Sequence, residues 1–299
     1  MNNWITARVS GRLGAAMLIT TALTMPVYAF GEDRWEDWRG GFRDSSRNCN
    51  LTIIGLTADQ KLVKLRGCDP TYPRAIWAIA GLTGSDTKLV GIDYRVQDGK
   101  LYGVGNGGGI YVVDPASGMA TKARQLTIAL DGDYFGIDFN PAADALRVLS
   151  NKGQNLRPPF ADPMAATVAD GALNYTAGAT ATGITGAAYV NNDLSADTGT
   201  LLFDIDSTLN QLALQVPPNA GSLVRVGTLT VDPDAPVGFD IYSKLRGGVT
   251  TENLAFATFV VAGVTSLYEI NLLTGSADRI DVLRDTVVDI AIPLDQRRQ

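Results

Sequence analysis

The chain has 299 residues, of which 45% are hydrophobic and 19% charged, and it contains no histidine. A chain of this length can bury a large core, and all-β folds of this size are often single domains. The absence of histidine excludes histidine-based triads, general bases and metal ligands, and it favours oxygen ligation of Ca²⁺ or Mg²⁺. A net charge of −6 disfavours nucleic acid as a partner.

Residues 1–29 have the pattern of a secretory signal peptide. Arg8 and Arg12 form a basic region, residues 13–23 form an apolar run, and small residues precede a cleavage site after Ala29. The run is shorter than the roughly 20 residues that a transmembrane helix needs. We therefore expect an exported protein, periplasmic or extracellular after cleavage, and not an integral membrane protein.

Residues 30–48 mix charges, glycines and aromatic side chains, and no period of 2 or 3.6 is sustained. This composition is typical of a flexible leader. The pair Trp35 and Trp38 leaves a docking segment as the alternative. The remaining residues, 49–296, are expected to form one domain.

Cys49 and Cys68 are the only cysteines, and they flank two strand-like segments, 51–57 and 61–66, joined by a turn. Pairing of these strands brings the two cysteines opposite each other. In an oxidising compartment they are expected to form a disulfide that stabilises this first hairpin. The C-x-x-C spacing of a redox pair is absent.

A short motif of a small residue, hydrophobic residues and an aspartate recurs along the rest of the chain. Its copies start 45 to 52 residues apart, near the period of propeller blades. Four copies are clear and the fifth is degenerate: 91–94, 136–139, 186–189, 238–241 and 289–292. Each clear copy begins a unit of four short strands separated by turn residues. In the second unit, the fourth strand is expected near 173–175.

The two ends of the chain supply the remaining unit. Near the N-terminus only three strands are expected, at 51–57, 61–66 and 75–82, while 286–293 is a spare strand that carries the fifth copy. Joining them leaves no open sheet edge between the first and last units. We therefore predict an all-β fold, a five-bladed β-propeller of four-stranded antiparallel blades, closed by the C-terminal strand that completes the N-terminal blade.

Several longer motifs carry a resemblance to a known family. They are LVGIDYR, KLYGVG, FGIDFNP, LRVLSNKGQNLR, TGAAYVNN, LLFDIDS, QVPPNAGSLVRVGTL and LYEINLLTG, distributed between residues 89 and 275. With these motifs the run from about 51 to 294 resembles the family catalogued as domain of unknown function 4394. The resemblance implies a bacterial, often exported, propeller-like domain, and it implies no catalytic residue.

The aspartates of the repeated motif are the first candidate site. Asp93, Asp138 and Asp240 occupy the same position in three copies, and alanine stands there in the other two. If the motif is the innermost strand of each blade, the three carboxylates converge near the axis. They can bind Ca²⁺ or Mg²⁺, or each can accept hydrogen bonds from backbone N–H groups of the next blade. Motifs that recur in every repeat favour the structural interpretation.

Polar residues of the segment 147–157 are the second candidate site. Gln154, Asn155 and Arg157 lie at a turn, with Arg147 on the preceding strand. They suit recognition of a carboxylate or a sugar. The alternative, which we favour, is that Asn155 stabilises the turn and Arg157 pairs with a neighbouring aspartate.

Two acidic segments, 191–197 and 204–206, alternate oxygen-bearing side chains in a way that resembles a calcium loop. Neither contains the glycine and terminal glutamate of that loop, so solvated turns are expected. No hydrolase, P-loop or other catalytic motif is present.

The sequence therefore favours an exported propeller that binds a small molecule or a protein and is not an enzyme. The alternative function is a Ca²⁺-dependent, lactonase-like hydrolase with the cation in the central channel. Propellers host both classes, so the fold alone does not decide.

Overall fold

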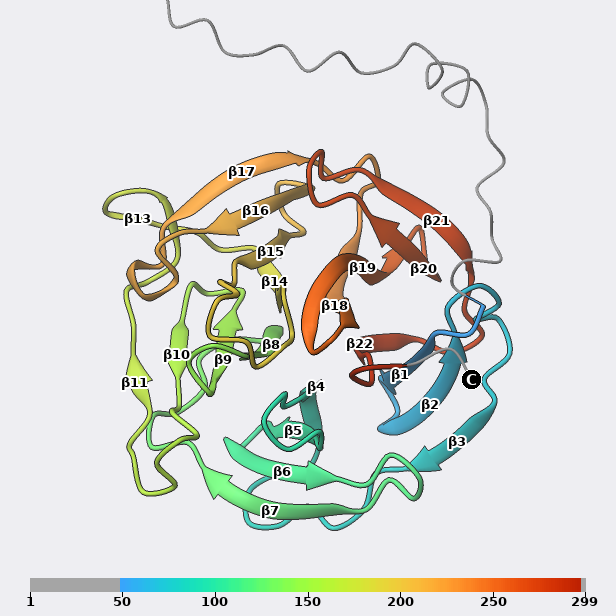
Figure 1. Ribbon diagram of the computed structural model, residues 1–299, viewed down its shortest axis with the longest axis horizontal. Coiled ribbons are helices and arrows are strands. Elements are labelled where there is room, and N and C mark those ends of the chain that lie inside the picture. The colour runs from blue at the N-terminus through green and yellow to red at the C-terminus, as the bar shows by residue number, and fades with distance from the viewer. Residues whose placement is uncertain (1–48, 297–299) are drawn as a thin grey trace, which may run out of the picture. The chain divides into compact units, whose positions relative to one another are not determined.

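The computed structural model describes residues 49–296, which form five four-stranded antiparallel sheets arranged in a ring (Figure 1). In four sheets the strand that comes first in the chain lies nearest the centre of the ring and the later strands follow outward, whereas in the fifth sheet the last strand of the chain is innermost. Among these residues the only helical segment is the short 3-10 turn η4 (Pro218–Ala220). The predicted five-bladed propeller is confirmed.

Blades 1 and 2 contain the ends of the described chain and the first clear repeat. From the centre outward, blade 1 consists of β22 (Val287–Ala291), β1 (Thr52–Thr57), β2 (Lys61–Arg66) and β3 (Ala75–Ala78). In the same order, blade 2 consists of β4 (Leu89–Tyr94), β5 (Leu101–Gly105), β6 (Gly109–Val113) and β7 (Ala120–Gln125).

Blades 3, 4 and 5 follow in chain order around the ring. Blade 3 consists of β8 (Phe135–Asn140), β9 (Ala145–Ser150), β10 (Asn155–Arg157) and β11 (Val168–Ala169). Blade 4 consists of β14 (Ile184–Tyr189), β15 (Leu202–Asp206), β16 (Gln211–Gln215) and β17 (Leu223–Thr228). Blade 5 consists of β18 (Asp234–Arg246), β19 (Val249–Val261), β20 (Val264–Ile270) and β21 (Ala277–Val282).

The ring is closed within blade 1, where the last strand pairs with the first. β22 is antiparallel to β1, with Gly55 opposite Ile290 and Ile54 opposite Ala291. Because strands from both ends of the described chain share one sheet, blade 1 has four strands like the other blades and the ring is closed, as the sequence predicted. Blade 1 is thus completed by the strand that carries the degenerate fifth motif.

The glycine that opens each clear motif allows the inner strands to approach one another closely. A Cβ atom at Gly136 of β8 would lie 2.7 Å from the backbone nitrogen of Ala187 in β14. A Cβ atom at Gly91 of β4 would lie 2.8 Å from a carboxylate oxygen of Asp289 in β22. Any side chain at these two positions would push neighbouring blades apart, so the motif is a packing device at the crowded axis.

Five separate hydrophobic clusters hold the ring together, one at each interface between neighbouring blades. Between blades 5 and 1, for example, Phe256 packs with Ile53 and Ile290. Burial of this kind of surface contributes about 25 cal/mol per Å², so the interfaces provide most of the stability. At the interface of blades 3 and 4 the apolar cluster lies beside buried charged groups, which include Arg147 and Asp204.

Blade 3 departs from the expected pattern at its outer edge. The fourth strand is β11, which pairs with β10 through Leu156 and Ala169, and the prediction of this strand near 173–175 is wrong. Residues 174–180 instead form a separate hairpin, β12 (Asn174–Thr176) and β13 (Ala179–Thr180), that belongs to no blade. Gly178, with a φ of 84°, provides the left-handed turn of this hairpin.

The predicted disulfide is present, with the Cα atoms of Cys49 and Cys68 4.7 Å apart. It connects the two ends of the β1–β2 hairpin. The signal peptide and leader predicted for residues 1–48 lie outside the described residues. Within 49–296, no helix is long and apolar enough to cross a bilayer.

Candidate functional site

Four carboxylates gather at the axis of the ring, one from each inner strand except β14. Asp93, Asp138 and Asp240 each place an oxygen within 4.8 Å of the oxygens of the other two. Asp289 of β22 lies beside them, because its Oδ2 accepts a hydrogen bond from the backbone of Ile92 in β4. We call these four residues the axial carboxylates. All are buried, with exposed fractions between 1% and 6%.

The axial carboxylates also join neighbouring blades. The N–H of Phe139 in blade 3 donates to Asp93 Oδ2 at 2.7 Å, and the N–H of Tyr189 in blade 4 donates to Asp138. The N–H of Ile292, which follows β22, donates to Asp240 Oδ2 at 2.5 Å. The structure therefore shows both geometric features considered from the sequence, namely convergence at the axis and capping by the next blade.

The protonation of the axial carboxylates is strongly perturbed. Burial raises the pKa of Asp240 to about 7. Burial, and then the neighbouring carboxyl of Asp240, holds the pKa of Asp93 well above its usual range. Burial followed by the carboxyls of Asp93 and Asp240 does the same to Asp138. Burial also raises the pKa of Asp289. Repulsion between the carboxylates and their burial away from water thus both raise the pKa values of this group.

Arg147 of β9 is fully buried and joins blade 3 to blade 4. Its guanidinium donates to Asn155 Oδ1 at 2.6 Å, to Asp170 Oδ2 at 2.7 Å and to Asn219 Oδ1 at 2.8 Å. A longer bond of 3.3 Å reaches the hydroxyl of Tyr189 in β14. Every nitrogen of this guanidinium therefore has a partner inside the protein.

The other candidate ligands of this segment are also engaged in internal bonds. Arg157 forms a bidentate pair with Asp170, at 2.8 and 3.0 Å. Gln154 accepts a hydrogen bond from the N–H of Asp131 and donates one to the carbonyl of Ala129. The structure thus brings Arg147, Asn155 and Arg157 together around Asp170, whereas Gln154 bonds to the loop before β8.

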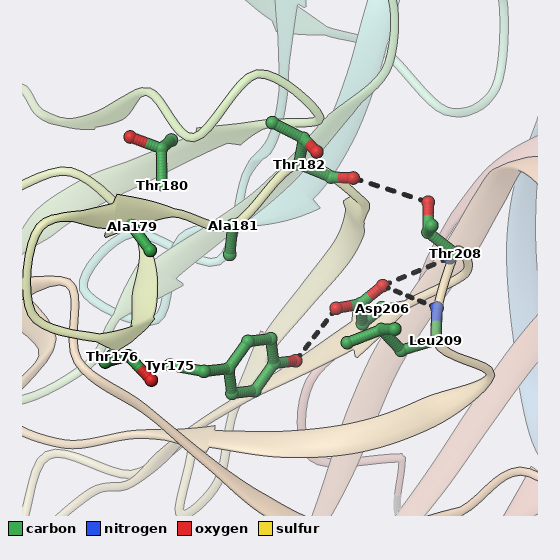
Figure 2. A pocket seen from close by; sticks show the side chains of 9 residues that line it. All are labelled: Tyr175, Thr176, Ala179, Thr180, Ala181, Thr182, Asp206, Thr208 and Leu209. Atoms are coloured by element: carbon green, nitrogen blue, oxygen red, sulfur yellow. Dashed lines mark hydrogen bonds between the residues drawn. The ribbon is translucent and has the colours of Figure 1, made fainter.

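A cavity of about 250 Å³ lies beneath the β12–β13 hairpin, at the edge of blade 4 (Figure 2). We call it the hairpin pocket. Its lining residues are Tyr175, Thr176, Ala179, Thr180, Ala181, Thr182, Asp206, Thr208 and Leu209. The phenol of Tyr175 points to Asp206 and donates to its Oδ2 at 2.9 Å. The other oxygen of Asp206 accepts from the N–H groups of Thr208 and Leu209.

Several polar groups of the hairpin pocket are available for a ligand. The hydroxyls of Thr176, Thr180 and Thr182 make no hydrogen bond within residues 49–296, whereas that of Thr208 reaches the carbonyl of Thr182. No lysine or arginine lines the pocket. Burial is the main cause that raises the pKa of Tyr175, and the Asp206 carboxylate adds to it. The phenol therefore stays protonated and can donate a hydrogen bond.

The expectation of solvated turns is wrong for 204–206; residues 191–197 do form a loop with Asp197 exposed, but Asn192 and Asp193 in it are buried. Asp204 and Asp206 lie in β15 and are 0% and 2% exposed, because β15 turns this side toward blade 3. Asp193 is also buried, and its Oδ2 accepts from the N–H and the hydroxyl of Thr250 in β19. The loop before β15 therefore fastens blade 4 to the β18–β19 hairpin of blade 5.

Three residues of these sites were not found from the sequence. Asp289 stands where the other copies of the motif have glycine, so its side chain was not counted with the axial aspartates. Tyr175 and Asp206 face each other only because the β12–β13 hairpin folds over β15. The available signal for Asp289 was the break in the motif itself, an acidic residue at a position that otherwise has no side chain.

Solved structures of low similarity share parts of this architecture. They include hydrazine synthase of Kuenenia stuttgartiensis, with 12% identity and a TM-score of 0.41. The match covers 68% of this chain and 51% of the hydrazine synthase chain. A nidogen/laminin complex matches with 8% identity and a TM-score of 0.46 over 83% of this chain and 100% of its own. Glutaminyl cyclase of Myxococcus xanthus matches with 14% identity and a TM-score of 0.36, over 68% of this chain and 69% of the cyclase chain.

The chain spans about half the length of the hydrazine synthase chain, and at these identities and TM-scores the likenesses carry no argument about function. No curated protein matches the chain. The model of one protein family, in contrast, matches residues 61–291, which include all of blades 2 to 5 and most of blade 1. The chain belongs to the family described as domain of unknown function, DUF4394.

Proposed function

We propose that the protein is an exported, non-catalytic binding module that takes a neutral polyhydroxy ligand, of the sugar class, in the hairpin pocket. The observation that carries the proposal is the lining of this pocket. Its oxygen-bearing side chains come from Tyr175, Asp206 and four threonines, and it contains no basic group. Hydroxyl ligands need both donors and acceptors, and threonine hydroxyls supply both.

The apolar part of the lining supports the same ligand class. Ala179, Ala181 and Leu209, together with the methyl groups of the threonines, give the pocket apolar walls beside its few polar groups. Small-molecule sites typically combine apolar walls with a small number of placed polar groups. The absence of lysine and arginine from the lining disfavours a phosphate or a carboxylate, since these ligands are usually paired with a cationic side chain.

Export is supported by the disulfide between Cys49 and Cys68, since such bonds persist in oxidising compartments. The signal-peptide pattern of residues 1–29 points the same way. A periplasmic or extracellular location fits a protein that meets free sugars or glycans.

The alternative function, a Ca²⁺-dependent hydrolase, receives less support from the geometry. Its substrate would have to reach the axial carboxylates, and the most exposed of them, Asp93, is only 6% accessible. A hydrolytic site needs room for substrate and water next to its reacting groups. The hairpin pocket, in contrast, opens at the side of the ring.

The test is a binding screen of mono- and oligosaccharides by saturation-transfer NMR, followed by calorimetry on each compound that binds. Thr180→Val and Thr176→Val remove hydroxyls that have no partner in the free protein, so folding should be unchanged. Each is expected to weaken binding about 2- to 10-fold, the equivalent of one lost hydrogen bond.

Thr121→Val, an exposed threonine of β7, is the matched control and should bind like wild type. The bound sugar should be recovered unchanged. If no sugar binds, if the pocket variants bind as well as the control, or if the sugar is hydrolysed, the proposed function is wrong.

A further inference from the structure

The axial carboxylates form a buried negative group without a basic partner. No salt bridge involves Asp93, Asp138, Asp240 or Asp289 among the described residues, and the charged groups that affect Asp93 and Asp138 most are other axial carboxylates. Several ionised carboxylates cannot share such a space unless a cation or protons compensate them. Backbone N–H groups cap one oxygen of Asp93 and both oxygens of Asp240, but they do not neutralise the charge.

An unsatisfied oxygen within this group indicates a missing ligand. Asp138 is 1% exposed, and its Oδ1 has no hydrogen-bond partner within the described residues. Its carboxyl already accepts the N–H of Tyr189, so this second oxygen is left for another partner. A fully buried acceptor without a partner is rare in native proteins and calls for an explanation such as an ion or a water molecule.

A second unsatisfied oxygen lies near the backbone of Asp289. The hydroxyl of Thr258 in β19 is 0% exposed and has no partner within residues 49–296. A Cβ atom at Gly238 would lie 2.5 Å from this hydroxyl and 2.8 Å from the Cα of Asp289, so the hydroxyl lies next to the contact between Gly238 and the backbone of Asp289. Two independent oxygens near the axis therefore lack partners.

The spacing of the carboxylates matches the size of a calcium ion. Ca²⁺–oxygen distances are about 2.3–2.6 Å, so two ligands on opposite sides of one ion lie about 4.6–5.2 Å apart. The oxygens of Asp93, Asp138 and Asp240 lie within 4.8 Å of one another, which is inside this span. Mg²⁺, with ligands at about 2.0–2.1 Å, spans only about 4.2 Å.

We infer that Asp93, Asp138 and Asp240 bind one Ca²⁺ ion on the axis of the propeller. The ion joins blades 2, 3 and 5 directly. Blade 4 supplies no carboxylate because Ala188 stands at its equivalent position, and the N–H of Tyr189 bonds to Asp138 instead. The site is independent of the hairpin pocket, since no residue is shared.

The first experiment measures the metal content and the thermal stability of the wild-type protein. Protein purified without chelator is expected to contain about one Ca²⁺ per chain by inductively coupled plasma mass spectrometry. Removal of the ion with EDTA during refolding should lower Tm by about 5–10 °C, the shift expected for a ligand present at about 100 times its Kd. Added Ca²⁺ should restore Tm, and Mg²⁺ should restore it less.

The second experiment uses a matched pair of aspartate variants. Asp138→Asn keeps an oxygen for the N–H of Tyr189 and removes one carboxylate ligand, so it should lose the bound ion and the response to Ca²⁺. Asp86→Asn is the control, because Asp86 is also buried but bonds to Tyr111 and Gly107 in blade 2. It should keep both the ion and the response.

Some results would overturn the inference even if Asp138→Asn failed to fold, since the wild-type measurements do not depend on it. The first is that wild-type protein contains no bound calcium and its Tm is unchanged by EDTA and by Ca²⁺. The second is that Mg²⁺ restores Tm as well as Ca²⁺ does. A stable Asp138→Asn variant that still binds calcium like wild type would also contradict it.

Discussion

Replacement of Arg147 by methionine should destabilise the fold strongly. Methionine has similar length and fills the same space, but it cannot donate the hydrogen bonds to Asn155, Asp170 and Tyr189. Asn155 and Tyr189 are 2% and 0% exposed, so two buried groups lose a partner at about 1–3 kcal/mol each. Asp204 in addition loses its positive neighbour. Breaking a buried ion pair by removing one partner typically costs about 3–5 kcal/mol.

Arg157→Met is the matched control, because Arg157 contacts the same Asp170 but its side chain is 26% exposed. A partly exposed ion pair contributes only about 1 kcal/mol or less. Both variants can be measured by urea denaturation followed by far-UV circular dichroism, with an unchanged m-value as evidence of the same transition. If Arg147→Met cost less than about 1 kcal/mol, or no more than Arg157→Met, the assignment of Arg147 to the interface between blades 3 and 4 would be refuted.

Two further predictions concern Asp204 and the disulfide. Burial raises the pKa of Asp204 well above its usual range, although Arg147 opposes this, so the folded protein binds the proton more tightly than the unfolded chain. Wild type should therefore lose stability as pH rises from about 4 through the raised pKa. In denaturation curves, the free energy of unfolding of Asp204→Asn should increase relative to that of wild type as pH rises over that range. A difference between the two proteins that does not change with pH would contradict this. Cys49→Ser/Cys68→Ser opens a loop with a sequence separation of 19 and should cost about 2–4 kcal/mol, measured in the same way. Wild-type protein treated with reductant is the control, and it should lose the same amount of stability.

The architecture could be predicted because the repeat is a local pattern with a global consequence. Gly91, Gly136 and Gly238 mark inner strands, and their even spacing gives the number of blades. The closing strand followed from counting, since blade 1 lacked an inner strand and residues 286–293 supplied one. Strand ends were less predictable. Pairing extends β18 and β19 to Arg246 and Val249, well beyond the residues with hydrophobic alternation.

The sites were less predictable because they depend on which blades meet. Asp204 and Asp206 alternate with hydrophobic residues, which is a strand pattern with one polar face. The sequence predicts that this face is solvated, yet both aspartates are buried: Asp204 lies near Arg147 of blade 3, and Asp206 bonds to Tyr175 of the β12–β13 hairpin. The contact between Arg147 and Asn219 joins residues 72 positions apart, and no local signal connects them.

The repeat of this propeller is irregular at two places, the axis and the interface of blades 3 and 4. At the axis, three copies of the motif carry an aspartate, one carries alanine, and the fifth moves its aspartate to the position of the glycine. An arrangement that served only to cap the next blade would work equally well with five identical copies. The uneven set instead leaves Asp138 with an oxygen that has no partner within the described residues, and it brings three carboxylates within 4.8 Å of one another.

The interface of blades 3 and 4 shows the second break. There the outer strand β11 is only two residues long, and the β12–β13 hairpin is inserted between the two blades. A shortened blade exposes the side of its neighbour, and the inserted hairpin roofs that side to form the pocket beside Asp206. The regular blades supply a rigid ring. The proposed Ca²⁺ ligands are the repeated aspartates of three inner strands, whereas the pocket uses the inserted hairpin. Binding in related chains should therefore be sought at the positions of Asp93, Asp138 and Asp240 and at the hairpin, rather than in the outer strands of the regular blades.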